Sequence, residues 1–367
     1  MIKKEMRFIP QMEPWFGNEE AAALNEYMLG DGWVTEFKKT EEFENRIADF
    51  VGVKHCVAVN NGTVSLTLAA IASGIGSGDD VIIPNYTMVA SPNSVKMIGA
   101  NPIFVDIELD SLCLDIELTR DAITPKTKAI ILVSANGRYP KHGIEKFSEL
   151  CKEKGLVLIE DSAQSLGSFY PDGSHIGSAG LIGSFSFSSP KIISTGQGGA
   201  LVTNDDDIAY KLRRLKDFGR SRGGIDFHDS IGYNFKFTDI QAVIGIEQMK
   251  KLQWRIERKK EIFRLYESNL NSLKEVAFFQ TDLQKTSPWF IDSLVENRTD
   301  LIKHLKSKNI GTRLMYPPLN KQKAYNLPGH FPCSDKIGES GLWLPSASQL
   351  ENEEVNIICR HIVDFYQ

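Results

Sequence analysis

The sequence predicts an α/β protein with a large domain, built on a mostly parallel mixed sheet flanked by helices, and a smaller C-terminal α/β domain. Between about residues 50 and 205, short apolar runs alternate with segments of helical spacing, which is typical of parallel strands covered on both faces. After Thr238 the alternation gives way to one long helical stretch. We therefore predict a large domain over residues 1–250 and a small domain over residues 251–367.

The apolar runs of the large domain are the predicted strands. In chain order they are His55–Val59, Val81–Pro84, Pro102–Val105, Ala129–Val133, Leu156–Ile159, Ser184–Phe187 and Ala200–Thr203. Three of the segments between them have helical spacing, namely Thr63–Ser73, Ser91–Gly99 and Ile144–Lys154. Because the runs are short and mostly apolar, each strand is expected to be buried on both sides.

The remainder of the chain predicts a long helix followed by a small α/β unit. Residues 239–270 have helical spacing with Thr238 or Asp239 as the N-cap, and this helix, straight or kinked, leads out of the large domain. The predicted elements beyond it are strands at Val276–Phe279 and Pro288–Leu294 and helices at Asp300–Lys308 and Glu351–Tyr366.

The composition excludes several classes of protein. The chain carries 42 basic and 47 acidic side chains, a net charge of −5, so a nucleic acid is not an expected partner. The cysteines lack C-x-x-C spacing and the histidines lack metal-ligand spacing, which predicts no disulfide framework and no metal site. The apolar runs are shorter than a membrane span of about 20 residues, and the first residues lack the apolar core of a signal peptide. We expect a cytoplasmic protein that does not enter a membrane.

An acidic pair, Glu160 and Asp161, directly follows a predicted strand. The carboxyl ends of strands are where open α/β sheets bind ligands. A carboxylate there has a specific use with pyridoxal 5′-phosphate (PLP), because Asp161 can keep the pyridine nitrogen protonated and make the ring an electron sink. Taken alone, the segment is equally compatible with a helix cap or a surface ion pair.

A single lysine, Lys191, stands between an aromatic strand and a glycine-rich turn. Its neighbours Pro190 and Ile192 are apolar. Desolvation lowers the pKa of an amine and so increases the fraction that is able to form an imine. The hydroxyl group of Ser186 is suited to a phosphate oxygen. A lone lysine in a loop is otherwise a solvated charge.

A third segment, Asn60-Asn-Gly62-Thr63, joins a predicted strand to a predicted helix. Free N–H groups at the start of a helix bind anions, and Thr63 adds a hydroxyl group. An ordinary strand–turn–helix cap is the alternative for this segment alone.

Together these segments resemble the DegT/DnrJ/EryC1/StrS family of sugar aminotransferases, which have the fold-type I architecture of PLP-dependent transferases. The resemblance extends over nearly the whole chain. The motifs that carry it are Trp33-Val-Thr35, Gly62-Thr63, Pro84-Asn-Tyr-Thr-Met-Val-Ala90, Glu160-Asp-Ser-Ala-Gln164, Phe185-Ser-Phe-Ser-Ser-Pro-Lys191-Ile-Ile-Ser-Thr-Gly-Gln-Gly-Gly199, Gly232-Tyr-Asn234 and Leu344-Pro-Ser346.

The resemblance implies a role for individual residues in binding PLP. Lys191 stands at the position of the lysine that carries the cofactor as a Schiff base and moves protons during catalysis. Asp161 matches the partner of the pyridine nitrogen, and Gln164 matches the residue that bonds the ring hydroxyl. The implied phosphate contacts are Gly62, Thr63 and Ser186.

Two further cofactor contacts follow from the same resemblance. Asn234 matches a phosphate contact that reaches in from a partner subunit, which implies a homodimer with shared active sites. Met88 stands where the family commonly has an aromatic residue against the cofactor ring. A thioether can pack on a ring face, and Tyr86 is the alternative.

The resemblance implies an amino transfer from L-glutamate to a keto sugar, as a nucleotide-linked 4-keto-6-deoxyhexose, for cell-surface polysaccharide. The predicted substrate contacts are Thr35, Arg138, Arg313 and Tyr316. Arg138 offers a fork for phosphate or carboxylate, so a small keto-phosphate is an alternative substrate. A non-catalytic regulatory protein is an alternative of another class. The related sugar 3-dehydratases have histidine at the position of Lys191, so this lysine disfavours a dehydratase.

Two other stretches are given structural interpretations. The basic run from Lys211 to Arg222 is predicted to be a solvated helix face, with contact to substrate phosphates as the alternative. Trp289 and Phe290 are predicted to lie in the core rather than to form a platform for substrate.

Overall fold

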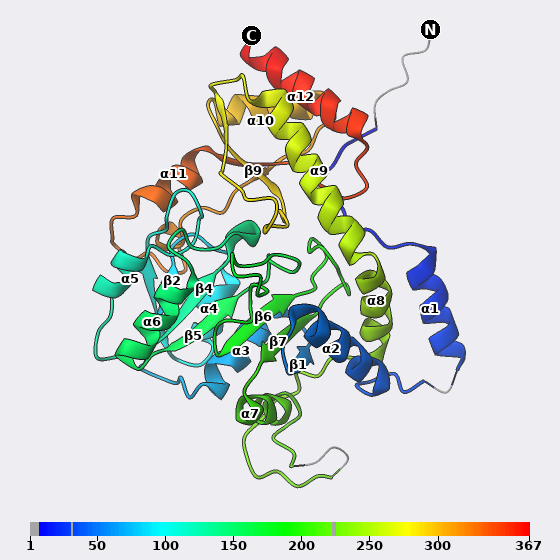
Figure 1. Cartoon of the computed structure of the whole chain (residues 1–367), viewed down its shortest axis with the longest axis vertical. Coiled ribbons are helices and arrows are strands. Elements are labelled where there is room, and N and C mark those ends of the chain that lie inside the picture. The colour runs from blue at the N-terminus through cyan, green and yellow to red at the C-terminus, as the bar shows by residue number, and fades with distance from the viewer. Residues whose placement is uncertain (1–6, 31, 222–224) are drawn as a thin grey trace.

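The computed structural model describes residues 7–30, 32–221 and 225–367. It has a large sheet domain at one end, a smaller sheet domain at the other, and a pair of consecutive helices that runs from one to the other (Figure 1). The helical pair consists of α8 (Asp239–Lys250) and α9 (Leu252–Leu270). The predicted long helix is therefore broken at Lys251, and the predicted cap is confirmed, because the Thr238 side chain accepts a hydrogen bond from the Gln241 N–H.

In the described part of the chain, the large sheet has seven strands in the order β1-β7-β6-β5-β4-β2-β3. Their bounds are β1 His55–Val59, β2 Asp80–Pro84, β3 Asn101–Val105, β4 Thr127–Val133, β5 Val157–Asp161, β6 Ile182–Ser186 and β7 Gly199–Thr203. Strands β3, β2, β4, β5 and β6 pair in parallel, whereas β7 is antiparallel to both of its neighbours. The sheet is thus mixed and mostly parallel, as predicted.

Helices cover both faces of this sheet because successive strand side chains point to opposite sides. Along β4, Ile131 packs in the cluster that includes Val64 and Leu68 of one layer, whereas Ile130 packs with Phe147 of the other. The helices of the large domain are α1 Asn18–Leu29, α2 Lys38–Val51, α3 Gly62–Ala72, α4 Ala90–Lys96, α5 Ile116–Asp121, α6 Ile144–Lys154 and α7 Asp206–Lys216. The sequence predicted α3, α4 and α6, and the basic run predicted to be a helix face lies largely on α7. It did not predict α1, α2 and α5.

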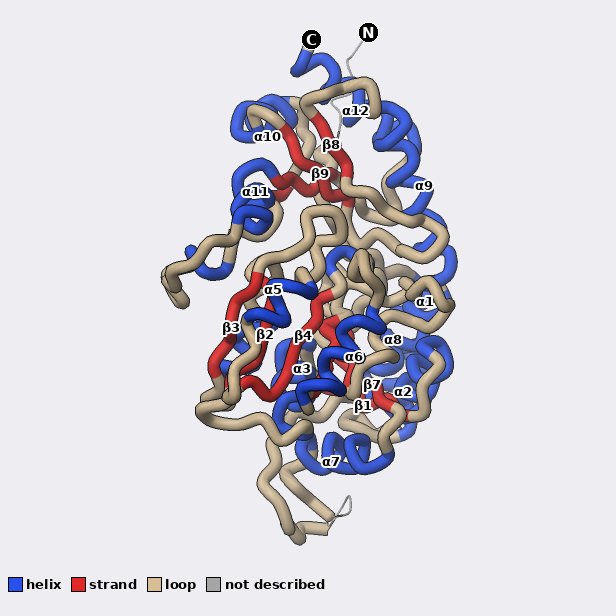
Figure 2. The backbone as a smooth tube through the Cα atoms, turned by 60° about the vertical axis from the view of Figure 1, so that its left-hand side comes forward, coloured by secondary structure: helices blue, strands red, loops and turns tan. Residues whose placement is uncertain are grey.

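The small domain is an antiparallel sheet with helices against it. Its strands, in the order β10-β11-β9-β8, are β8 Val276–Phe278, β9 Ile291–Val295, β10 Arg313–Leu314 and β11 Gly341–Leu344. Its helices are α10 Arg298–Ser307, α11 Pro332–Ser340 and α12 Asn352–Tyr366. Figure 2 shows β8 and β9 beyond the end of the large sheet. Ile9 from the start of the chain packs in the same core as α9 and α12.

The described residues show no membrane-crossing or metal-binding element. None of their helices combines the length and the apolar composition that a bilayer span requires. They also contain no group of three or more histidine, cysteine, aspartate or glutamate side chains placed to hold a metal ion.

Candidate active site

Asp161 and Lys191, the two predicted catalytic residues, lie at the edge of the large sheet where β5 and β6 end. Asp161 is the last residue of β5 and Ser186 the last residue of β6, and the two strands pair in parallel. Lys191 follows in the loop after β6, where its N–H donates to the Ser188 carbonyl (2.9 Å). Parallel strands end at the same edge of a sheet, so residues 30 positions apart in the sequence share one site.

The Lys191 amine is desolvated and lies near opposite and like charges. Burial lowers its pKa from 10.5 to about 8, the Asp161 carboxylate opposes this change, and the Arg313 guanidinium adds to it. The Nζ atom lies 4.1 Å from the centre of the Trp289 ring. A lower pKa gives the amine a larger neutral fraction near pH 7, which is what a nucleophilic lysine requires.

The Asp161 carboxyl group is buried, and burial raises its pKa. Its Oδ2 accepts a hydrogen bond from Ser91 Oγ (2.7 Å) and its Oδ1 one from the Ala163 N–H (3.2 Å), and both bonds stabilise the ionised form. Ser91 was not predicted as a site residue, although it directly follows the family motif Pro84–Ala90 in the sequence.

The structure brings together the three residues predicted to contact phosphate. Gly62 and Thr63 begin α3, where Asn61 caps the helix by accepting from the Val64 N–H (2.9 Å). The first N–H groups of a helix have no acceptor within it and can bind an anion. A Cβ atom on residue 62 would lie 2.9 Å from the Ser186 Cβ, so only glycine allows this close approach.

Gln164 and Met88 lie in different surroundings. Gln164 Oε1 accepts the Asn136 N–H (2.7 Å), which fixes the orientation of its amide group. Met88 is 44% exposed and its sulfur accepts the Ala90 N–H (3.0 Å), whereas the alternative, Tyr86, is buried. Of the two residues predicted to pack against the cofactor ring, Met88 is therefore the one whose side chain is exposed.

Two of the four predicted substrate contacts, Arg313 and Tyr316, interact electrostatically with Lys191 or Asp161. Arg313 is close enough to lower the pKa of Lys191, and it also acts on Tyr316. Burial raises the pKa of Tyr316, and the Asp161 carboxylate adds to that shift. Arg313 and Tyr316 thus share the electrostatic surroundings of Lys191 and Asp161.

Arg138 does not have the free guanidinium that the predicted substrate role requires. It is buried, and its two terminal nitrogens donate to the two carboxylate oxygens of Asp292 (2.7 and 2.8 Å). Its Nε and Nη2 also donate to Thr281 Oγ1 (3.2 and 2.9 Å). The guanidinium group is therefore bound to Asp292 of β9 and to Thr281. Arg138 joins the large sheet to the small one instead of facing a ligand.

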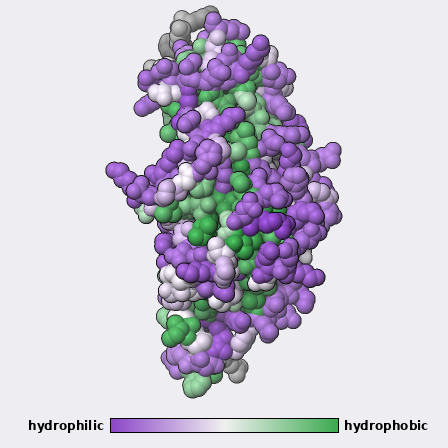
Figure 3. All heavy atoms as spheres, turned by 90° about the vertical axis from the view of Figure 1, so that its left-hand side faces the viewer, coloured by the Kyte–Doolittle hydropathy of each residue, from purple (hydrophilic) through white to green (hydrophobic). Residues whose placement is uncertain are grey.

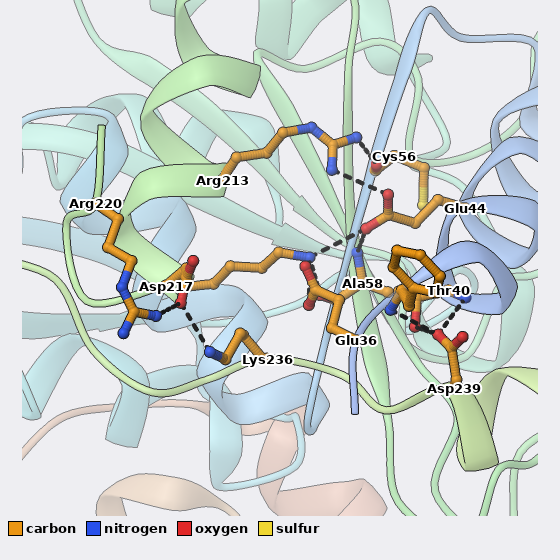
Figure 4. Close-up of polar contacts among 12 residues, drawn as sticks. Glu36, Thr40, Glu44, Cys56, Ala58, Arg213, Asp217, Arg220, Lys236 and Asp239 are labelled. Atoms are coloured by element: carbon orange, nitrogen blue, oxygen red, sulfur yellow. Dashed lines mark hydrogen bonds and ion pairs between the residues drawn. The ribbon is translucent and has the colours of Figure 1, made fainter. Parts of the chain in front are cut away.

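The exposed Thr35 lies in a loop that a buried charge network holds in place (Figure 4). The next residue, Glu36, pairs with Lys216 Nζ (3.0 Å), which also bonds Glu44 (3.2 Å). Asp239 accepts the N–H groups of Phe37 and of two further residues at the start of α2. These contacts anchor the end of the loop that leads into α2.

The same network corrects the prediction for the basic run. The run lies largely on α7, but Lys216 is only 1% exposed, and Arg213 also pairs with Glu44 (3.0 Å). Lys216 is thus an internal partner of carboxylates, whereas the Arg213 side chain pairs with Glu44 while remaining 48% exposed. Arg222, at the end of the run, lies outside the described residues.

The residues of the site fit PLP. Lys191, Gln164 and Ser186 line one small cavity together with Ser162 and Ser287. The hydroxyl groups of Ser162 and Ser287 are buried without a hydrogen-bond partner among the described residues. An amine near a buried carboxylate, beside a helix start that has room only for glycine, provides the donor set that the aldehyde, ring nitrogen and phosphate of PLP require. The fold and this site define a PLP-dependent enzyme of fold type I.

Comparison with known proteins identifies the family. The family model described as the DegT/DnrJ/EryC1/StrS aminotransferase family matches residues 15–363, and the chain belongs to this family. It is a PLP-dependent aminotransferase. Among curated proteins, it is 37% identical over 366 residues to the GDP-perosamine synthase of Escherichia coli O157:H7, covering 98% of this chain and 99% of that protein. It is 34% identical over 367 residues to the GDP-perosamine synthase of Vibrio cholerae, with the same coverage.

Solved structures agree with this assignment. S. venezuelae DesV in complex with a ketimine intermediate superposes with a TM-score of 0.91 at 29% identity, covering 99% of both chains. The PLP form of Spr1654 from Streptococcus pneumoniae has a TM-score of 0.89 at 26% identity, covering 97% of both chains. The fold predicted from the sequence is thereby confirmed.

Proposed function

We propose that this protein transfers an amino group from L-glutamate to a nucleotide-linked 4-keto-6-deoxyhexose for a cell-surface polysaccharide such as O-antigen. The observation that carries the chemistry is the Lys191 amine, with its pKa lowered to about 8, in the field of the buried Asp161 carboxylate. The substrate class is supported by the relatives named GDP-perosamine synthase, which match nearly the full length of the chain.

Each of the predicted site residues has a separate role in binding the cofactor or transferring a proton. When bound, PLP supplies an electron sink for the negative charge that develops on the substrate carbon. Asp161 holds the proton on the ring nitrogen, while Lys191 carries the cofactor and then moves a proton to and from the substrate carbon. Gln164 would bond the ring hydroxyl of bound PLP, and Met88 would lie against the ring. Gly62, Thr63, Ser186 and the Asn234 of a second subunit would hold the phosphate.

Arg313 and Tyr316 are the proposed substrate contacts beside the lysine. The guanidinium group of Arg313 can bind a carboxylate or phosphate through two parallel hydrogen bonds. Tyr316 lies against Tyr86, with ring centres 5.9 Å apart, and brings a hydroxyl group to the same region. Thr35, on the loop that Glu36 and Lys216 anchor, is proposed to contact the sugar nucleotide.

The homodimer is supported by an exposed arm and exposed apolar side chains. Asn234 lies in the segment between α7 and α8, which extends below the large domain (Figure 1), and its side chain is exposed. Apolar side chains that are at least 38% exposed on this segment and on the Thr35 loop include Phe218, Phe227, Ile231, Tyr233, Trp33 and Phe37. Figure 3 shows apolar side chains at this lower end of the molecule. A second copy would cover such a surface.

A panel of ketones tests the proposal. The purified protein, loaded with PLP, should lose its yellow colour when L-glutamate is added and regain it with a nucleotide-linked 4-keto-6-deoxyhexose, and mass spectrometry should find the amino sugar. GDP, dTDP and UDP sugars and small keto-phosphates form the panel. Turnover of keto-phosphates alone would overturn the substrate class. The keto-phosphate alternative has lost its support in the structure, because the Arg138 guanidinium is bound to Asp292.

A further inference from the structure

Trp289, which the sequence placed in the core, contacts the candidate catalytic lysine directly. Its indole ring is 4% exposed and its centre lies 4.1 Å from Lys191 Nζ. Its Nε1–H donates a hydrogen bond to the Pro190 carbonyl oxygen (2.7 Å). The carbonyl group immediately before Lys191 is therefore held by a side chain from the loop that leads into β9.

The carbonyl group of Ile192, the residue after Lys191, accepts a hydrogen bond from a side chain of α9. Arg255 is 3% exposed, and its Nη1 donates to the Ile192 carbonyl (2.8 Å) and to Gln248 Oε1 (2.6 Å). Its Nη2 donates to the Trp15 carbonyl (2.9 Å). A guanidinium group with fixed donor directions restrains an acceptor more strictly than a flexible ammonium does.

The same face of α9 supports Trp289 as well. Lys259 lies one turn after Arg255, is fully buried, and its Nζ donates to the carbonyl oxygens of Trp289 (2.7 Å) and Ser346. No carboxylate in the described part of the chain pairs with it, and burial, with Arg255 adding to the effect, lowers its pKa to about 7. A buried amine with only carbonyl acceptors holds the backbone of residue 289 from behind.

We propose that Trp289 and Arg255 are positioning residues that fix the backbone on both sides of Lys191. The loop that carries Lys191 has no strand or helix of its own, so its position depends on bonds from other elements. The long side chain stays free to move between cofactor and substrate, while its Cα is anchored at residues 190 and 192. The inference rests on the proposed role of Lys191. Trp289 lines the same cavity as Lys191, whereas Arg255 is not among the residues that line it.

The test removes one donor at a time. Trp289→Phe keeps an aromatic face beside Lys191 but deletes the N–H group that bonds Pro190. In the cofactor-free protein, amide deuterium exchange should become faster in the peptide spanning residues 188–195, where Lys191 N–H bonds the Ser188 carbonyl. In the PLP-loaded protein, the limiting rate constant for bleaching by the amino donor should fall about 10-fold, with its half-saturating concentration changed less than about 2-fold, as a misplaced catalytic group predicts.

The controls separate positioning from packing. Trp254→Phe, on α9 but 51% exposed, should leave exchange and rate unchanged. Arg255→Lys should accelerate exchange in the same peptide as Trp289→Phe does. Wild-type exchange and rate in both site variants, or exchange that rises equally over the whole chain, would reduce both residues to core packing. Both readouts are independent of the keto sugar, and borohydride labelling tests the role of Lys191 separately, so the failures of the two proposals are distinguishable.

Discussion

At the scale of single residues, the site depends on how burial changes the pKa of two groups. Burial lowers the pKa of the Lys191 amine to about 8, which favours the neutral nucleophile, and raises that of the Asp161 carboxyl group. The bonds from Ser91 and Ala163 oppose the second shift. The positive ring nitrogen of bound PLP would oppose it as well, because an opposite charge stabilises the carboxylate.

Lys191→Ala should abolish turnover and leave the fold intact, because it removes the imine-forming amine and the proton carrier while the partly exposed side chain adds little packing. Borohydride reduction of the PLP-loaded wild type should attach the cofactor to the peptide that contains Lys191, as peptide mass spectrometry would show. Attachment to a different lysine, such as the fully buried Lys259, would contradict the assignment.

Asp161→Asn should reduce turnover about 100-fold or more, the order expected when a group that stabilises transition-state charge is lost. Retention of PLP should change much less, since the phosphate contacts remain. The measurement compares kcat with the dissociation constant for PLP. Near-native kcat in the variant would make Asp161 a structural residue.

His175 gives the fold a predicted acid sensitivity. Its buried ring accepts the Gly167 N–H at Nε2 (2.9 Å) and bonds the Ile176 carbonyl through Nδ1 (2.6 Å), and burial lowers its pKa from 6.5 to about 4. The unfolded chain therefore binds this proton more tightly, so the contribution of neutral His175 is complete above pH 6.5 and is lost as the pH falls toward 4.

The corresponding experiment measures urea unfolding of the cofactor-free protein at pH 7 and pH 5. Between these values His175 should account for a loss of about 2 kcal/mol, at about 1.4 kcal/mol per pH unit below 6.5. His175→Asn should be less stable at pH 7 but should lose less stability on acidification. An identical loss in both proteins would show that other groups cause the acid sensitivity.

At the scale of elements, buried ion pairs fix how the sheets, helices and loops meet. Arg138 follows β4 and Asp292 lies on β9, 154 positions later, so their pair ties the large sheet to the small one. Lys216 at the end of α7 similarly ties Glu36 and Glu44 to the Ala58 carbonyl of β1 (3.0 Å). Both pairs lie between elements that meet only in the folded chain.

Arg138→Met should destabilise the protein by about 3–5 kcal/mol, because it leaves the Asp292 carboxylate buried and unpaired. Adding Asp292→Leu should recover most of the loss, since the isolated charge is then gone. Urea unfolding measures both, and Lys303→Met, at an exposed pair with Asp300, should change stability by less than about 1 kcal/mol. A small effect of Arg138→Met would mean that the pair contributes little.

At the scale of the whole molecule, the proposed homodimer makes each active site depend on two chains. Inactive Lys191→Ala subunits mixed with Asn234→Asp subunits, whose new carboxylate repels phosphate, should regain part of the activity. Each heterodimer would have one doubly damaged site and one intact site. Light scattering should show the dimer. Absence of recovery despite subunit exchange between two impaired variants would mean that each chain builds its own site.

The sequence by itself determined the strands of the large sheet and the positions of Lys191, Asp161 and Gly62. Apolar runs, helical spacing and strand-end residues are patterns among neighbouring residues, so they can be recognised in the sequence alone. The helices that it missed are α1, α2, α5 and α11, of which α5 and α11 are short, with six and nine residues. It also placed Gly62 where a strand passes into a helix, since these elements follow one another directly in the chain, and the structure shows that Gly62 begins α3.

Only the tertiary structure decided which distant residues meet. The sequence predicted a ligand contact for Arg138, whereas folding paired Arg138 with Asp292. Trp289 and Phe290 lie in the core as predicted, but only the fold set the Trp289 ring against Lys191. It also placed Ser91 on Asp161 and buried Lys216. A side chain's charge and size are visible in the sequence, but its partner depends on how helices and sheets pack, because burial makes a charge take the nearest opposite charge or acceptor that the fold supplies.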